Sequence, residues 1–326
     1  TVVDNVIGGN GPIIGAGIAV ADSTISNLSI ANNTIDNTGA MGLRVAGLTA
    51  GLVDTEVVID GNRIGGAGAI GTFTTDHGID VDDLTGIDLV VTDNRVGQGA
   101  AVAGAGIHIS NVNGGNSHTA SGNLVDNTGG SGIELAVVSG NITISDNVVG
   151  GTGTIGGKGI EFGNSNVVNV TISGNAIDNT GNHGLHVHDL AGPAGGQSLL
   201  IDGNFIAGSG TVGDAADEHG IFIGPIGGLD VHLTHIAIGQ GARDTVRMLR
   251  GFWKYRWLSA SLATPRMVDK WIEGDRGMVL RADLTAIDCM ISDSITTMWR
   301  ELRADRRFGE TKWTERTIAF DYTLPK

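Results

Sequence analysis

The sequence predicts an all-β fold, a parallel β-solenoid of about eight to nine coils, on three observations. An asparagine recurs every 24 to 32 residues, a glycine-led strand motif follows each asparagine, and glycine is too frequent for helices. Periodicity of this length marks stacked copies of one supersecondary unit. We expect the solenoid to span residues 1–241.

The asparagine of each repeat lies between two short apolar segments. These asparagines are Asn5, Asn33, Asn62, Asn94, Asn123, Asn147, Asn175 and Asn204. Asparagine suits a bend because it tolerates left-handed backbone geometry and can hydrogen-bond its own backbone. When copies stack in register, its amide can also bond the next asparagine along the stack. The spacing therefore predicts a column of linked asparagines.

The strand that follows has the pattern glycine, apolar, variable, apolar. Its copies begin at Gly17, Gly42, Gly78, Gly106, Gly132, Gly159, Gly184 and Gly220. A period of two directs the apolar pair inward and the variable residue outward. Helices are excluded here, because glycine at roughly one residue in five would cost about 1 kcal/mol per position. Such short strands must pair with neighbouring copies to satisfy their backbone groups.

The interval from asparagine to glycine takes three lengths, 9, 12 or 16 residues. The nine-residue intervals all contain Asp-Asn-Thr-Gly, and both 16-residue intervals end in an acidic residue, histidine and glycine. This higher-order pattern indicates segmental duplication, which favours a structural or multivalent role over one unique active site. In the 16-residue intervals, His77 and His219 are interpreted as turn residues.

Composition changes abruptly near residue 242. Residues 1–241 hold 23 acidic and four basic residues, whereas residues 242–326 hold 12 acidic and 16 basic residues and all five tryptophans. The asparagine column ends at Ile236. Apolar spacing predicts a helix near 279–306. The segment 242–326 could be a cap on the solenoid, a fusion, an insertion or a change of reading frame, and its basic aromatic stretch could contact nucleic acid or a membrane surface.

The charge of the repeat region excludes several partners. Its acidic field argues against nucleic acid and anionic membranes for residues 1–241. No apolar run approaches the length of a transmembrane helix. The sole cysteine, Cys289, excludes an internal disulfide. The chain opens within a repeat at Thr1 without a signal peptide, so we expect a fragment of a longer protein.

The repeated Asn-x-Ile and Gly-Ile-x-Val signatures of residues 1–241 resemble right-handed parallel β-helix proteins, the pectin-lyase-like superfold. In style they are most similar to repeat regions of bacterial autotransporter passengers and exported adhesins. The resemblance implies a right-handed coil and a location outside the cell or on the bacterial surface. It does not define an activity, because this superfold hosts lyases, hydrolases, epimerases and inert stalks.

We expect any chemistry on the outward positions of the glycine-led strands. They form the column Ala19, Arg44, Asp80, His108, Glu134, Glu161, His186 and Phe222, beside Asp82, Ser110, Ala136, Gly163 and His188. Coils stack about 4.8 Å apart, so these groups would align on one face. Candidate catalytic residues are Glu134, Glu161, His108 and His186, and candidate binding residues are Asp80, Asp82, Ser110 and His188.

Carboxylate spacing is compatible with glycoside chemistry, as it is for outward carboxylates on neighbouring coils of any solenoid. Glu134 and Glu161, on adjacent coils, would approach the separation of a retaining glycosidase pair, and Asp80 with Glu134 that of an inverting pair. The alternative is a solvated polar face. The active-site motifs of β-helix pectinases are missing, and an acidic groove would repel a polyuronate unless a cation neutralised it.

Two residue sets could hold a metal ion, although the fold requires no cofactor. Asp76, Asp80, Asp82 and Asp83 could form a calcium cradle, because calcium takes six to eight oxygen ligands. His183, His186 and His188 resemble a zinc-type cluster. For both sets the alternative is a group of solvated side chains.

The duplicated coils favour a non-enzymatic scaffold that makes weak multivalent contact through its acidic, polar face. The resemblance to adhesin and passenger repeats implies that this scaffold is exported and that its ligands are glycans or surfaces. The alternative is a carbohydrate-active enzyme, a lyase, hydrolase or epimerase, that uses the outward carboxylates and histidines. Sugar-cleaving grooves usually offer stacking platforms, and Phe222 alone provides a phenyl ring in the column. Low aromatic content therefore favours the scaffold.

Overall fold

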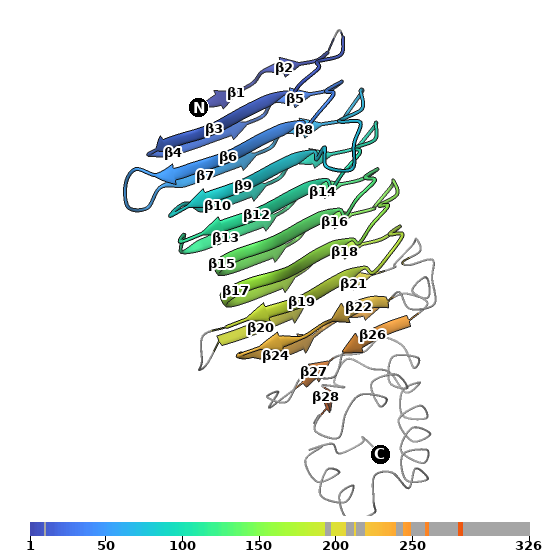
Figure 1. Cartoon of the computed structure of the whole chain (residues 1–326). Coiled ribbons are helices and arrows are strands. Elements are labelled where there is room, and N and C mark those ends of the chain that lie inside the picture. Colours follow the sequence, from blue (N-terminus) through green and yellow to red (C-terminus); the bar gives the residue numbers. More distant parts are fainter. Residues whose placement is uncertain are drawn as a thin grey trace, which may run out of the picture.

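The computed structural model describes residues 1–9, 11–192, 197–206, 212, 219–238, 244–248, 258–260 and 280–282. Within these residues all regular structure is β-strand, and the chain winds into a parallel β-solenoid of about eight turns (Figure 1). The fold class predicted from the repeats is therefore confirmed. Among the described residues, no helix has the length and apolar character needed to cross a bilayer.

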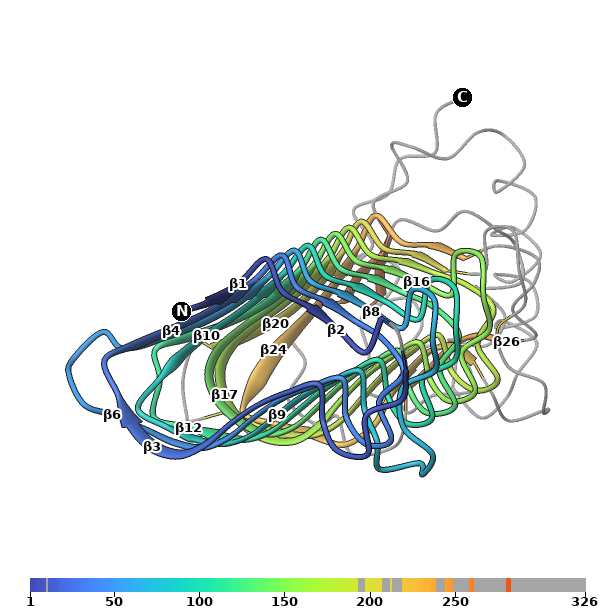
Figure 2. The ribbon, with the colours of Figure 1, turned by 90° about the horizontal axis from the view of Figure 1, so that it is seen from above.

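Three faces run along the solenoid. The face that carries the predicted column, which we call the strip face, consists of β3 (Ile18–Ile25), β6 (Leu43–Ala50), β9 (Ile79–Thr85), β12 (Ile107–Asn113), β15 (Ile133–Ser145), β17 (Ile160–Ser173), β19 (Leu185–Ala191), β22 (His219–Ile223) and β26 (Asp244–Met248). Seen from above the stack, successive coils repeat one outline around a common interior (Figure 2).

The second face consists of β1 (Val2–Val3), β4 (Asn27–Ala31), β7 (Glu56–Asp60), β10 (Asp88–Thr92), β13 (Ser117–Ser121), β20 (Gln197–Asp202) and β24 (Leu229–Thr234). It also takes the C-terminal halves of β15 and β17, which continue round from the strip face. The two-residue β23 (Ile226–Gly227) pairs with the end of β19.

The third face consists of two-residue strands: β2 (Val6–Ile7), β5 (Thr34–Ile35), β8 (Arg63–Ile64), β11 (Arg95–Val96), β14 (Leu124–Val125), β16 (Val148–Val149), β18 (Ala176–Ile177), β21 (Phe205–Ile206) and β25 (Ala237–Ile238). A series of single parallel bridges from Ile13 to Val212 also links each coil to the next.

Inward-facing residues of one coil pair with inward-facing residues of the next, and most of them are apolar. Ile107 lies between Ile79 and Ile133, and all three side chains are fully buried. The inward valine, leucine and isoleucine columns of successive coils merge into one apolar core. Because each coil has almost no core of its own, stacking supplies the burial that stabilises it.

The predicted asparagine column is confirmed. In each step the side-chain amide nitrogen donates to the amide oxygen of the next asparagine, as in Asn62 to Asn94 (3.0 Å) and Asn94 to Asn123 (3.1 Å). The left-handed backbone lies one residue earlier than expected, at residues such as Asn32 and Asp93, so the column asparagine serves hydrogen bonding and its predecessor makes the bend. Ile236, where the column ends, is buried.

The end of the array differs from the predicted boundary in one respect. β26 pairs with β22, so the strip face continues past residue 241. Leu280–Ala282 is a strand, β28, that pairs with β27 (Leu258–Ala260). Most of the predicted second unit 242–326, including the remaining positions of the expected helix, lies outside the described residues.

One core column contains an ionisable residue. His118 of β13 lies between Leu89 and Ile142, is 2% exposed, and has no hydrogen-bond partner on either ring nitrogen. Burial disfavours the imidazolium form and lowers the pKa of His118. Asp88 and the Ser139 backbone offset only part of this burial cost, so the polar ring weakens an otherwise aliphatic column.

We expect His118→Leu to stabilise the protein by about 1–2 kcal/mol at neutral pH, because it removes an unpaired buried polar group. The folded-state pKa of His118 lies below its unfolded value, so wild-type stability falls as pH decreases below about 6.5. The stability advantage of His118→Leu over the wild type should therefore increase as the pH decreases below about 6.5. Urea unfolding at pH 8 and pH 5 measures the free energy of unfolding of the variant and the wild type. His232→Leu, a substitution on the outward side of β24, is the control. A variant less stable than wild type at both pH values would contradict it.

Candidate functional site

The strip face aligns the predicted columns in register. Arg44 pairs with Asp80, Asp80 with His108, His108 with Glu134, Glu134 with Glu161, Glu161 with His186, and His186 with Phe222. The second column, Asp82, Ser110, Ala136, Gly163 and His188, is aligned in the same way. These two columns, which we call the strip, gather all eight candidate catalytic and binding residues on one face.

A third column, of which the sequence analysis assigned only His183 to a candidate site, lies beside the strip. It consists of the residues before the glycines: His77, Ala105, Ser131, Lys158, His183 and His219. The His77 ring stacks on His108 with centroids 4.3 Å apart, and the His219 ring is parallel to Phe222 at 5.9 Å. The interpretation of His77 and His219 as turn residues was therefore incomplete, because their side chains reach the strip.

The N-terminal half of the strip centres on Asp80, which is 5% exposed. His108 contacts it through Nδ1 at 2.9 Å, and the Arg44 guanidinium lies 3.6 Å away. Burial disfavours a charged imidazole, but the hydrogen bond and charge of Asp80 outweigh it and raise the pKa of His108. Burial and the neighbouring His108 lower the pKa of His77 to about 4. A neutral ring thus stacks on one that protonates readily.

The predicted calcium ligands Asp76, Asp80, Asp82 and Asp83 do not converge on one point, and those with hydrogen bonds or ion pairs have different partners. Asp76 accepts hydrogen bonds from the backbone N–H groups of Thr72 and Phe73, at 2.8 and 2.7 Å, and so anchors a turn. Asp80 is engaged by His108 and Arg44. Asp83 is exposed and has a φ of 55°. Among the described residues, these four carboxylates are not a set with ligand atoms within 4.8 Å of one another, so the structure does not assemble the predicted cradle.

Asp82 and Ser110 form a hydrogen-bonded pair in the second column. The Ser110 hydroxyl donates to Asp82 at 2.7 Å, and the Asn111 amide donates to the same oxygen at 2.8 Å. Burial raises the pKa of a carboxyl, but these two donors outweigh it and lower the pKa of Asp82. Asp82 is therefore a fixed anion at the edge of the strip.

Glu134 links the two halves of the strip. It lies half-buried on β15 between His108 and Glu161. Burial and the negative charge of Glu161 raise the pKa of Glu134. A carboxyl in this setting holds its proton to higher pH than an exposed glutamic acid.

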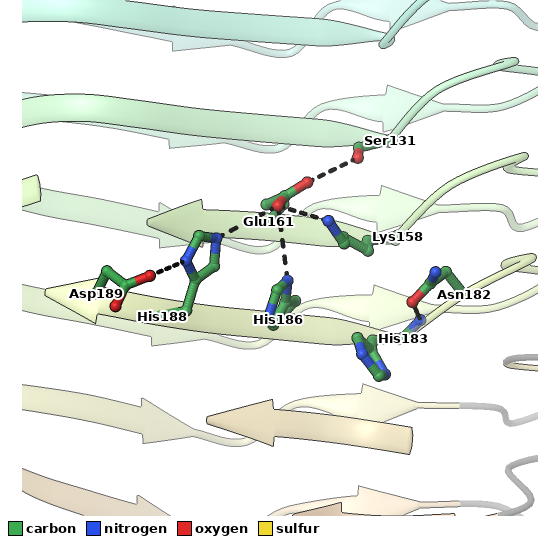
Figure 3. Close-up of polar contacts among 8 residues, drawn as sticks. All are labelled: Ser131, Lys158, Glu161, Asn182, His183, His186, His188 and Asp189. Atoms are coloured by element: carbon green, nitrogen blue, oxygen red, sulfur yellow. Dashed lines mark hydrogen bonds and ion pairs between the residues drawn. The ribbon is translucent and has the colours of Figure 1, made fainter. Parts of the chain in front are cut away.

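The C-terminal half centres on Glu161 (Figure 3). Its Oε1 lies 2.6 Å from Lys158 Nζ, 3.4 Å from His188 Nε2 and 3.6 Å from His186 Nδ1. The Ser131 hydroxyl donates to Oε2 at 3.2 Å. Burial opposes ionisation, but the contacts with both histidines and Lys158 hold the pKa of Glu161 well below its usual range.

The two histidines beside Glu161 differ. The hydrogen bond to Glu161 raises the pKa of His188, whose Nδ1 also lies 2.9 Å from Asp189. Burial lowers the pKa of His186 and outweighs the opposing effect of Glu161, whose Oε1 lies 3.6 Å from His186 Nδ1. His188 therefore protonates more readily than a free imidazole and His186 less readily, although both contact the same carboxylate.

The structure replaces one member of the predicted zinc-type cluster, with Glu161 in the place of His183. Glu161, His186 and His188 bring their ligand atoms together, whereas His183 is not part of this group. The Nδ1 of His183 accepts the backbone N–H of His219 at 2.9 Å, and its ring stacks on Phe222 at 4.9 Å. Glu161 was missed as a ligand because it precedes the histidines by a full coil.

Comparison with known proteins gives no match of the chain to a protein-family model, a curated protein or a solved structure. The function proposed below therefore rests on the fold and on the residues of the strip.

Proposed function

We propose that the chain is an exported β-solenoid scaffold whose strip binds glycans through several weak contacts. The observation that carries this proposal is the continuous row of carboxylates and imidazoles from Asp80 to His188, aligned over successive coils of one face. Charge-assisted hydrogen bonds from such groups suit sugar hydroxyls, and a repeated row suits a repeated polymer.

Two further features support glycan binding. The strip side chains are positioned before any ligand arrives, by contacts such as His108 with Asp80 and Ser110 with Asp82. At the C-terminal end, the partly exposed rings of His183 and Phe222 stack with centroids 4.9 Å apart and form a small platform. Preorganised polar groups beside a flat surface lower the ordering cost of binding. The resemblance of the repeats to pectin-lyase-like β-helices and to adhesin and autotransporter passenger repeats supports a place outside the cell or on a bacterial surface.

A glycan array followed by calorimetry with a bound oligosaccharide tests the proposal. Asp80→Asn should weaken binding about tenfold or more, because it removes the buried carboxylate that positions His108 and Arg44 on the strip. Asp60→Asn is the matched control, since Asp60 is an outward carboxylate on the second face bonded to Thr92. An array without bound glycans, or equal losses for the two variants, would refute glycan binding by the strip.

A second candidate, glycoside hydrolysis, rests on a different observation. Glu134 and Glu161 pair on adjacent strands, and their pKa values are displaced in opposite directions. Such divergence assigns acid and base roles to carboxyl pairs. Protonated Glu134 would give its proton to the leaving glycosidic oxygen, while the Glu161 carboxylate attacks the anomeric carbon. Water would then cleave the glycosyl ester, with Glu134 accepting its proton.

Release of reducing ends from polysaccharides measures this activity. Glu134→Gln should lower the rate by about 10²-fold or more, because an amide cannot supply the proton. Wild-type activity should decrease as pH rises through the raised pKa of Glu134. A rate unchanged in Glu134→Gln would assign the turnover to other residues and remove this candidate.

A further inference from the structure

Glu161, His186 and His188 surround one point with three ligand atoms. The Glu161 Oε1 lies 3.6 Å from His186 Nδ1 and 3.4 Å from His188 Nε2, and all three atoms lie within 4.8 Å of one another. Zinc bonds of about 2.0–2.1 Å in a tetrahedron place neighbouring ligand atoms roughly 3.3 Å apart. Two of the three separations are therefore close to those of a zinc site before an ion is added.

From this geometry we propose that Glu161, His186 and His188 bind a divalent transition-metal ion, with zinc as the preferred occupant among common cellular ions. Two imidazoles and one carboxylate suit zinc, whereas calcium and magnesium prefer sites made of oxygen. Three protein ligands also leave a coordination position open to water or to a ligand oxygen.

The surrounding residues support metal binding independently of the ligand distances. His188 offers Nε2 to the site while its Nδ1 contacts the Asp189 carboxylate at 2.9 Å. Ser131 fixes the other oxygen of Glu161 at 3.2 Å. Such outer partners set the orientation and basicity of metal ligands. His186 Nδ1 is buried, and Glu161 Oε1 lies 3.6 Å from it, beyond ordinary hydrogen-bond distance, so an ion between the two atoms would satisfy both.

Lys158 modulates this site. Its ammonium lies 2.6 Å from the Glu161 oxygen that would face the ion, and its side chain is 26% exposed. Because lysine is unbranched and flexible, it can turn toward solvent when the doubly charged ion enters. Until then it compensates the carboxylate and competes with metal for it. Removing this ammonium should therefore tighten metal binding.

The second compact group on the strip serves as an internal comparison. His77, Asp80 and His108 also have ligand atoms within 4.8 Å of one another. There, however, the His77 Nδ1 accepts the backbone N–H of Ala105 at 3.0 Å, and the Arg44 guanidinium lies 3.6 Å from Asp80. One imidazole nitrogen is thus already occupied, which favours the Glu161 site.

Titration of the untagged, chelator-treated chain with Zn²⁺, and with Co²⁺ followed by absorption, tests the proposal. We expect one tightly bound ion per chain and the visible bands of low-coordinate cobalt. His188→Ala and Glu161→Gln should each weaken affinity about 10²-fold or more, whereas Lys158→Met should strengthen it about tenfold. His108→Ala is the matched control and should leave the affinity unchanged.

Circular dichroism of each variant separates lost ligands from lost folding, and Lys158→Met tests the site by a gain that misfolding would not produce. Absence of a tight site in the wild type, a site abolished by His108→Ala, or unchanged affinity in both His188→Ala and Lys158→Met would overturn the proposal. Metal binding does not depend on the proposed glycan contacts, since the titration contains no glycan.

Discussion

Replacing Asn94 with alanine should lower the free energy of unfolding by roughly 3–5 kcal/mol, because it leaves several buried groups without partners. The Asn94 side-chain oxygen accepts from both the backbone and the side-chain nitrogen of Asn62, each at 3.0 Å. Its nitrogen donates to Ile59 at 2.9 Å and to Asn123 at 3.1 Å. All of these asparagines are almost completely buried, so water cannot replace the lost bonds.

Urea unfolding followed by circular dichroism measures the loss, with Asn5→Ala as the matched control. Asn5 is an exposed residue at the first step of the same column, where its side chain donates to Asn33 at 2.9 Å. We expect its removal to lower stability by about 1 kcal/mol or less. Equal losses for the two variants would show that the buried ladder does not stabilise the solenoid beyond ordinary stacking.

The ladder was predictable because in-register stacking makes sequence spacing equivalent to spatial neighbourhood. Once the repeat was recognised, each asparagine had to lie beside the next. The same argument placed Glu134 between His108 and Glu161, as the register confirms. The position of the left-handed residue was not predictable in this way, because asparagine, aspartate and glycine all tolerate it and all occur beside the column.

Contacts between side chains of different coils were harder to predict. The sequence analysis grouped His183, His186 and His188 because they lie close together in the chain. The His183 ring does lie near that of His186, with centroids 5.1 Å apart, but its Nδ1 accepts the backbone N–H of His219. Neighbouring coils are about 4.8 Å apart, so Glu161, directly opposite His186 on the preceding coil, is the third member of the group.

The site proposals constrain one another through Glu161. A metal ion bound by Glu161, His186 and His188 would occupy the carboxylate that glycoside hydrolysis needs as its nucleophile. Lys158 contacts the same oxygen, so it would hold Glu161 ionised for hydrolysis but compete with a metal ion for that oxygen. Zinc should consequently inhibit any hydrolysis that depends on Glu134 and Glu161, while glycan contacts at Asp80, three strands away on the strip face, should persist.

The glycine that opens each strip strand should be as sensitive as the asparagine column. A Cβ atom added at Gly132 would overlap Val149 and lie 2.7 Å from the backbone oxygen of Gly159. That oxygen cannot retreat freely, because it accepts the N–H of Ile133 at 3.0 Å. We expect Gly132→Ala to lower stability by about 3 kcal/mol, near the upper end for overpacked interiors.

Because β15 begins at Ile133, the displacement caused by Gly132→Ala should also reach Glu134 and weaken any ligand bound across the strip. Gly15→Ala is the matched control: no atom lies within 4 Å of a Cβ at Gly15, so its stability should change by less than about 0.5 kcal/mol. The urea unfolding midpoints of Gly132→Ala and Gly15→Ala measure this difference in stability. If both are equally mild, the recurring glycine reflects the history of duplication rather than the close approach of neighbouring coils.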